Sequence, residues 1–237
     1  MAAIKDNAMM VEITRITKRA ELADEHVQIS YYCGDLKVAH ELYDSKGNVV
    51  QASGSIPDGT VKEYYDDGIL KEAALFQDGK ANGRSILYYP DGKIFEMKNY
   101  TNGLLHGWSR TYRRNGTLWM QSSFFEGKLH GRFTSYHNNG IAEIKAEYWN
   151  GRLNGHSLIY DRAGNLRKEG VFIMGKRNGE HLSYYASGEL ARRETYRSGW
   201  LLSCEEYTED GMSIATWDNG HNRRPRHCNG EDSYNSA

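Results

Sequence analysis

The sequence predicts an all-β protein, built as an elongated single antiparallel sheet of tandem β-hairpin repeats of 24 residues each. Two observations lead to this prediction. The 237 residues include 25 Gly and 17 Tyr but only 3 Pro, and glycine and tyrosine both disfavour helices whereas tyrosine favours strands. In addition, several residue columns recur along the chain with one constant period, which is typical of repeat architectures.

The repeat unit is defined by tyrosine, glycine and aromatic columns, each with a spacing of 24 residues. Each unit reads Y-x3-G-x7-(F/Y)-x2-G-x3-G, so that two runs of about six to eight residues are bounded by glycines, as in two strands of a hairpin. The columns are Tyr64, Tyr88, Tyr112, Tyr136, Tyr160 and Tyr184; Gly68, Gly92, Gly116, Gly140, Gly164 and Gly188; and Phe76, Tyr100, Phe124, Tyr148, Phe172 and Tyr196.

Strand alternation predicts which face of the sheet forms the core. Successive side chains of a strand point to opposite faces. Within each unit the repeat tyrosine, the position two after the first glycine and the aromatic column all have even numbers, as in Tyr64, Leu70 and Phe76. We therefore expect the even-numbered positions to share the core face.

The two ends of the array depart from the consensus, as expected of units that cap a repeat sheet. We expect residues 1–42 to form an N-terminal capping segment with a degenerate repeat, residues 43–220 the repeat array, and residues 221–237 a flexible tail. The sheet is expected to start near residue 24. Residues 1–23 fit either a strand, through Val11, Ile13 and Ile16, or a short helix.

Composition excludes several classes of protein. A mean hydropathy of -0.74 leaves no run approaching the roughly 18 apolar residues of a membrane span. Thirty Lys and Arg balance 31 Asp and Glu, without the basic excess of nucleic-acid-binding domains. The cysteines Cys33, Cys204 and Cys228 are odd in number and far apart, and the first residues lack a signal-peptide pattern. A cytoplasmic location is therefore expected.

No residue pattern indicates catalysis, a metal or a cofactor. His106 and His130 occupy the same position in adjacent repeats, about 9.6 Å apart in a sheet, whereas two zinc ligands each lie about 2 Å from the metal. The sequence holds no GxSxG or similar arrangement for a nucleophile, and its glycines do not form a phosphate-binding loop. We therefore expect no enzyme, no metal and no cofactor.

The segments GLLHGWSRTYRRNG, GKLHGRFTSYHNNG and GRLNGHSLIYDRAG closely resemble the MORN repeat, in particular the bacterial variant found in YwqK-type antitoxins. The resemblance covers roughly residues 43–220. It implies a twisted sheet that serves as a scaffold for protein contacts, and in some relatives for membranes. The antitoxin likeness further implies neutralisation of a toxin by binding. Asn82, Asn154 and Asn178 stand where other units have His106 and His130.

The odd-numbered positions are free to encode a particular function, because the repeat commits the even-numbered ones to the core. Large apolar side chains gather there in the middle of the array, and arginines lie nearby in the sequence. Exposed aromatics and arginine are typical of protein interfaces. The predicted partner-binding residues are Phe95, Met97, Trp119, Phe125, Phe133 and Trp149, with a basic rim of Arg110, Arg113, Arg114 and Arg132.

The expected function is that of a non-enzymatic scaffold that binds a protein partner, such as a toxin or a subunit of a complex, and no nucleic acid. Two alternatives stay open at this stage. The aromatics could be ordinary core if both faces of the sheet are covered, for instance by the N-terminal segment. The arginines and aromatics could instead attach the protein to anionic membrane lipids. The oligomeric state is left open.

Overall fold

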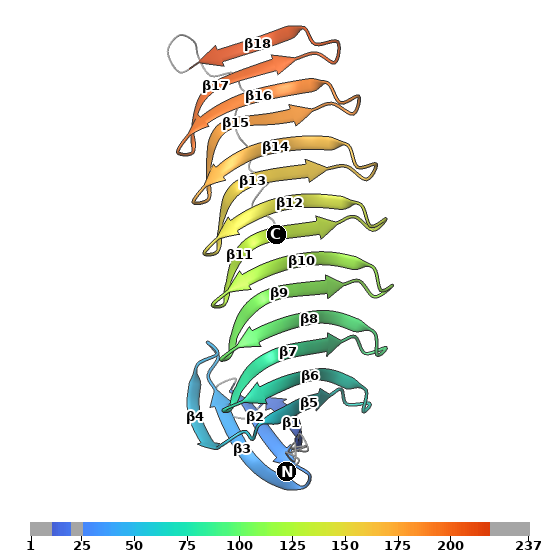
Figure 1. Cartoon of the computed structure of the whole chain (residues 1–237), viewed down its shortest axis with the longest axis vertical. Coiled ribbons are helices and arrows are strands. Elements are labelled where there is room, and N and C mark those ends of the chain that lie inside the picture. The colour runs from blue at the N-terminus through green and yellow to red at the C-terminus, as the bar shows by residue number, and fades with distance from the viewer. Residues whose placement is uncertain (1–10, 20–25, 219–237) are drawn as a thin grey trace, which may run out of the picture. The chain divides into compact units, whose positions relative to one another are not determined.

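The computed structural model describes residues 11–19 and 26–218, and these residues form 18 β-strands and no helix (Figure 1). The predicted all-β class of hairpin repeats is therefore confirmed. Within the described ranges there is consequently no helix long and apolar enough to cross a membrane. The predicted tail at residues 221–237 lies outside the described residues.

The chain divides into two compact units, and the division runs through strand β10 (Leu118–Phe125). The first unit contains the described residues up to Leu118 together with Phe124–Gly127, and the second contains Trp119–Ser123 and the described residues from Lys128 onwards. The other strands of the first unit are β1 (Val11–Arg19), β2 (Val27–Cys33), β3 (Leu36–Tyr43), β4 (Val49–Gly54), β5 (Gly59–Tyr64), β6 (Leu70–Gln77), β7 (Lys80–Tyr88), β8 (Ile94–Thr101) and β9 (Leu104–Tyr112).

The strands of the second unit are also arranged as successive hairpins. They are β11 (Lys128–Tyr136), β12 (Ala142–Trp149), β13 (Arg152–Tyr160), β14 (Leu166–Ile173), β15 (Lys176–Tyr184), β16 (Leu190–Arg197), β17 (Trp200–Tyr207) and β18 (Ser213–Asp218). From β5 to β9 in the first unit, and from β11 to β18 in the second, each strand pairs antiparallel with its successor.

Each repeat contains two different turns. The turn after β6 has two residues, Asp78 and Gly79, with φ angles of 51° and 71°, which is the backbone of a type I′ hairpin. The turn after β7 is longer, and Gly92 (φ 79°) donates its N–H to the Tyr89 carbonyl at 2.9 Å. The ladder register shifts beside this turn, because Leu87 pairs with Glu96 whereas Tyr88 pairs with Ile94.

These turns correct the predicted core face. Across the two-residue turn Phe76 pairs with Ala81, so an even-numbered residue of one strand shares its face with an odd-numbered residue of the next. On the second strand of each repeat the even positions face the core as predicted, and Phe172 and Tyr196 are buried. On the first strand the prediction was wrong, and Tyr64 is 39% exposed.

The buried position of the first strand is instead an odd-numbered column, in which small and polar side chains predominate. Its neighbours across the ladder are also small: Ser85 faces Ala74, Phe133 and Ser157 both face Ala146, and His181 faces Gly170. The column consists of Ser85, Ser109, Phe133, Ser157 and His181.

The N-terminal strands form a different arrangement, in which β1 lies between β2 and β5. It pairs antiparallel with β2 and parallel with β5, where Ile13 faces Val61. Ile13 is fully buried among Tyr31, Ala39, Ile56 and Val61. The expected start of the sheet near residue 24 was therefore wrong, and of the two readings of residues 1–23 the strand is right for Val11–Arg19. The rest of that segment lies outside the described residues.

Candidate functional site

The ten predicted partner-binding residues lie on five strands and one turn. Some of these residues belong to the first unit and the others to the second. Phe95 and Met97 lie on β8, Arg110 on β9, Arg113 and Arg114 in the turn after β9, Trp119 and Phe125 on β10, Arg132 and Phe133 on β11, and Trp149 on β12.

In the first unit the structure brings Phe95, Met97 and Arg110 together. Met97 faces Arg110 in the ladder between β8 and β9, and Phe95 precedes Met97 by two residues, so the three side chains share a face. The guanidinium of Arg110 lies over the Trp108 ring, 5.0 Å from its centroid. The Phe95 ring packs on Tyr89 with 4.9 Å between centroids. In this part of the predicted surface Phe95 and Met97 are half-buried, Arg110 is exposed, and aromatic rings pack beside them.

Two arginines of the predicted basic rim have local structural partners. Arg113 donates to the carbonyl oxygen of Leu118 at 3.2 Å, across its own turn. The Nε atom of Arg114 lies 3.0 Å from Asp91 Oδ2, and its guanidinium lies over the Tyr89 ring at 6.0 Å. The sequence reasoning missed these partners, since Asp91 is one repeat away and reaches Arg114 only through the sheet.

The repeat histidines stack on the aromatic residues of the predicted surface. His106 packs on Phe125 with ring centroids 5.1 Å apart in the first unit, and His130 packs on Trp149 at 4.3 Å in the second. In both cases the histidine shortly after the hairpin turn packs on an exposed ring of the following strand. This is a structural role for the histidine column.

In the second unit Trp119 and Trp149 are exposed, by 45% and 54%, whereas Phe133 is only 9% exposed. Phe133 belongs to the buried column, faces Ala146 and packs edge-on against Tyr148 with centroids 5.9 Å apart. The expectation that Phe133 lies on an exposed face of the sheet was therefore wrong. Its cause is the reversed alternation on the first strand of each repeat. For the same reason Arg132, its even-numbered neighbour, lies on the solvent side.

A hollow of about 590 Å³ lies on this solvent side of the second unit. Sequence reasoning found Arg132 but missed Lys145 and His156, which lie on the next two strands. We call this site the basic hollow. It is lined from β10, β11, β12 and β13 by Gln121, Arg132, Phe133, Thr134, Tyr136, Ala142, Lys145, Ala146, Glu147, His156 and Leu158. Trp119 is two residues from Gln121, and Trp149 two residues from Glu147, so the two exposed indoles flank the basic hollow.

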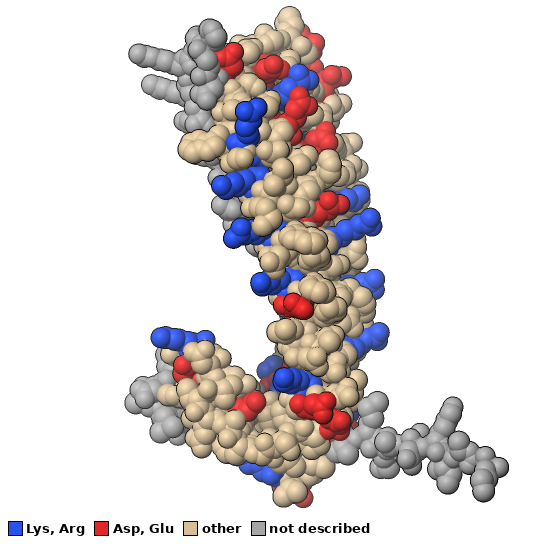
Figure 2. Space-filling model, turned by 60° about the vertical axis from the view of Figure 1, so that its left-hand side comes forward, with Lys and Arg blue, Asp and Glu red and all other residues tan. Residues whose placement is uncertain are grey.

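Charge over the surface is mixed rather than of one sign. Lysine and arginine side chains recur along the face seen in Figure 2, with acidic side chains among them. A field of this kind gives little long-range attraction for polyanions, in agreement with the net charge of -1. Local groups of charges are therefore more informative than the total.

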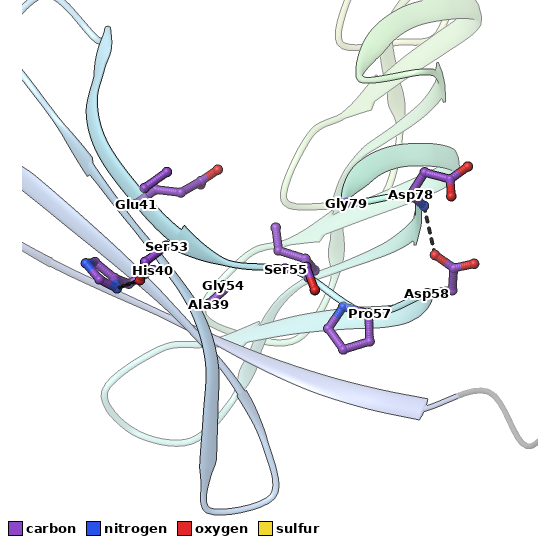
Figure 3. Close-up of a pocket in the computed structure, with 12 residues that line it drawn as sticks. Ala39, His40, Glu41, Ser53, Gly54, Ser55, Pro57, Asp58, Asp78 and Gly79 are labelled. Carbon is purple, nitrogen blue, oxygen red and sulfur yellow. Dashed lines mark hydrogen bonds between the residues drawn. The ribbon is translucent and has the colours of Figure 1, made fainter.

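A second hollow, of about 530 Å³, lies in the first unit beside β3 and β4 (Figure 3). Within it His40 Nδ1 lies 2.6 Å from Ser53 Oγ, and the Asp78 N–H donates to Asp58 Oδ1 at 2.8 Å. A catalytic Ser–His pair needs a carboxylate that orients the imidazole. The adjacent Glu41 accepts instead from the hydroxyls of Tyr31 and Tyr43, at 3.1 and 2.9 Å.

The Glu41 carboxylate thus accepts hydrogen bonds from Tyr31 and Tyr43 and does not orient the His40 imidazole. Burial, reinforced by the hydrogen bond to Glu41 and by its negative charge, raises the pKa of Tyr43 to about 12. Among the residues that the structure describes, no carboxylate therefore completes a triad with His40 and Ser53. Nor do these residues contain a group of three or more His, Cys, Asp or Glu side chains placed to hold a metal ion.

Comparison with known proteins identifies the repeats. Residues 57–78, 81–102, 129–150 and 177–198 match the MORN repeat variant family. Each matched segment covers one pair of strands. The four pairs are β5–β6, β7–β8, β11–β12 and β15–β16. The chain matches no curated protein. Four segments of the chain therefore match the MORN repeat variant, and each of them folds as an antiparallel pair of strands within the hairpin scaffold.

Proposed function

We propose that this scaffold binds a protein partner, without catalysis, through the solvent side of its repeat strands. The observation that carries the proposal is the exposure of Trp119 and Trp149 on either side of the basic hollow. Tryptophan and arginine dominate the binding energy of protein interfaces, and exposed aromatic patches on a soluble surface commonly mark such sites. A toxin neutralised by binding is the most specific partner that the family resemblance suggests.

A protein partner accounts for this surface better than a lipid bilayer does. Interfacial membrane binding relies on a strongly basic face with apolar side chains beside it. Here Arg114 is paired with Asp91, and Glu147 lines the basic hollow together with Arg132 and Lys145. Carboxylates interspersed with the cations suit a protein partner whose complementary charges lie at defined positions, whereas a bilayer presents anionic headgroups over the whole face.

The test is partner capture with the double variant Trp119→Ser, Trp149→Ser. Wild-type protein is used to isolate a partner from native lysate, and the affinity of the purified pair is then measured by calorimetry. We expect the double variant to weaken binding at least about a hundredfold, as loss of two hot-spot side chains would do, with unchanged circular dichroism and melting temperature.

Two controls accompany this experiment. Trp200→Ser removes an indole that is 77% exposed but lies outside the basic hollow and its flanks, and it should leave the affinity unchanged. Phe133→Ser removes a buried ring and should lower the melting temperature. Equal binding by the wild type and the double variant would contradict the proposal. Co-sedimentation with phosphatidylserine vesicles that is lost with added salt would favour the membrane alternative.

A further inference from the structure

The basic hollow has an excess of positive charge that is local to this part of the array. Arg132 and Lys145 occupy two columns of the solvent side. The Lys145 column holds Glu169 one repeat later, and the Arg132 column holds Glu180 two repeats later. Arg132 and Lys145 therefore form a local pair of cations within the second unit. The columns vary while the architecture does not, which indicates a recognition surface and not a structural requirement.

The carboxylate of the hollow makes no ion pair with these cations. Glu147 faces Arg132 in the ladder, yet the described residues contain no ion pair between them. The Glu147 side chain lies instead over Gly155, where a Cβ atom would fall 2.2 Å from Oε2. The glycine of the repeat bulge thus makes room for the carboxylate on β13.

The Lys145 ammonium is likewise without a carboxylate partner among the described residues. Its Nζ atom lies over the Tyr160 ring, 5.1 Å from the centroid. Arg132 and Lys145 are both exposed, so a ligand can reach them. Cations that line a concavity without a carboxylate partner are available to pair with an incoming anion.

The relative position of the two cations sets the spacing of the anions that they suit. Lys145 precedes Glu147 by two residues, and Glu147 faces Arg132, so Arg132 and Lys145 are diagonal neighbours. Such neighbours lie about 7–8 Å apart in an antiparallel pair. In an extended peptide, side chains two residues apart point the same way with a separation of about 7 Å.

We propose that the basic hollow binds an extended acidic segment of the partner protein, in which two carboxylates two residues apart pair with Arg132 and Lys145. The residue between them points away from the hollow, and the next apolar residue on the bound side packs on Leu158 and Tyr136. Trp119 and Trp149 cover the two ends of the segment. This inference rests on the proposed function and specifies the chemistry of its partner.

The test uses three synthetic peptides and isotope-labelled protein. Gly-Ser-Glu-Ser-Glu-Ser-Leu-Gly carries the required spacing with its Leu on the bound side, Gly-Ser-Glu-Glu-Ser-Ser-Leu-Gly has adjacent carboxylates, and Gly-Ser-Gln-Ser-Gln-Ser-Leu-Gly is neutral. Each is titrated in two-dimensional ¹H–¹⁵N NMR. We expect the first peptide to bind at least about tenfold more tightly than the other two, a difference that the loss of one charge-assisted pair would produce, with shifts confined to residues 119–123 and 130–160.

A charge-reversed protein provides the matched comparison. Arg132→Glu, Lys145→Glu should reduce affinity for the first peptide at least about tenfold. Lys128→Glu, Lys176→Glu makes the same change in net charge at two exposed lysines outside the hollow, and it should bind like the wild type. Circular dichroism checks that both variants are folded.

The outcomes separate this inference from the proposed function. Absence of binding, equal binding of the three peptides, or equal loss in both charge variants would overturn the acidic-segment proposal, and so would saturation by inorganic phosphate at the same cations. The general protein-binding proposal would still stand in those cases if Trp119→Ser, Trp149→Ser abolished partner capture. Binding of phosphatidylserine vesicles in place of the first peptide would contradict both.

Discussion

At the scale of single residues, Gly54 is the position where a side chain is least tolerable. It ends β4 with a φ angle of 76°, and a Cβ atom there would lie 2.0 Å from the Val38 carbonyl oxygen and 2.9 Å from the Ala39 Cα atom. These are backbone atoms, which a rotamer change does not move. The glycine is required because the end of β4 lies directly against the backbone of β3, where Gly54 pairs with Ala39.

We therefore predict that Gly54→Ala lowers the free energy of unfolding by about 3 kcal/mol or more, through clash and backbone strain together. Gly92→Ala is the matched control, because its φ of 79° carries the same conformational strain but nothing lies within 4 Å of its Cβ position. Its cost should be about 1–2 kcal/mol. Urea unfolding of both variants measures the difference, and equal costs would show that the contact with the β3 backbone adds no penalty.

His181 is a residue whose protonation opposes folding. Its ring is buried between Phe172 and Tyr196, with centroids 5.0 and 5.1 Å away, and Nε2 lies 2.9 Å from the Val171 carbonyl oxygen, to which it donates. Gly170 leaves the space for the ring, since a Cβ atom there would lie 2.2 Å from Nδ1. Burial lowers the pKa of His181 below its usual 6.5, and the charge of Arg177 lowers it further, against the effect of the Val171 carbonyl.

Because this pKa is lower in the folded state, the unfolded chain binds the proton first as the pH falls below about 6.5. The contribution of His181 to stability is thus complete above that pH and is lost progressively below it. We predict that His181→Phe, the residue type at the equivalent Phe133, reduces the drop in melting temperature between pH 7.5 and 5.5. An undiminished drop would show that other groups cause it.

At the scale of elements, β1 is held by ion pairs as well as by Ile13. Arg15 Nη2 lies 2.5 Å from Glu63 Oε2 and also contacts Glu72, while Lys71 Nζ lies 3.0 Å from Glu63 Oε1. The Glu63 side chain is only 8% exposed. A carboxylate so deeply buried is tolerable only while its cationic partners remain.

Arg15→Met should therefore lower the free energy of unfolding by about 3 kcal/mol, since breaking one side of a buried pair leaves an uncompensated charge. The double variant Arg15→Met, Glu63→Gln removes that charge and should recover part of the loss. Hydrogen exchange of β1 and β5 amides, compared with chemical denaturation, shows whether the loss is local. No recovery in the double variant would argue against a charge effect.

The strands and turns also show which parts of the fold could be predicted from the sequence. The strands, hairpin turns and repeat boundaries were predicted because they depend on local features, such as Gly92 and Gly79 with their positive φ angles. Trp119 and Trp149 were correctly placed at odd positions of second strands, and they are exposed. Phe133 was misplaced because a two-residue turn reverses the alternation between strands, and the pattern of one strand does not reveal the phase of the next.

At the scale of the whole molecule, the repeat places the residues that stabilise the fold and the residues available for binding on opposite sides of the strands. In each unit one side of the strands contains the buried column and its small neighbours, so the chain can vary the other side at little cost to the fold. The local excess of cations at Arg132 and Lys145, followed by Glu169 in the next repeat, is variation of this kind. A net charge of -1 conceals it completely.

The amino-acid sequence by itself determined the period, the all-β class and the positions of the turns, because glycine columns and strand alternation act over a few residues. Only the tertiary structure decided which face of each strand is buried, that β1 pairs in parallel with β5, and that Arg132, Lys145 and His156 meet in one hollow. These features depend on register and on bulges between strands. They arise from pairing across the sheet, which no single strand encodes.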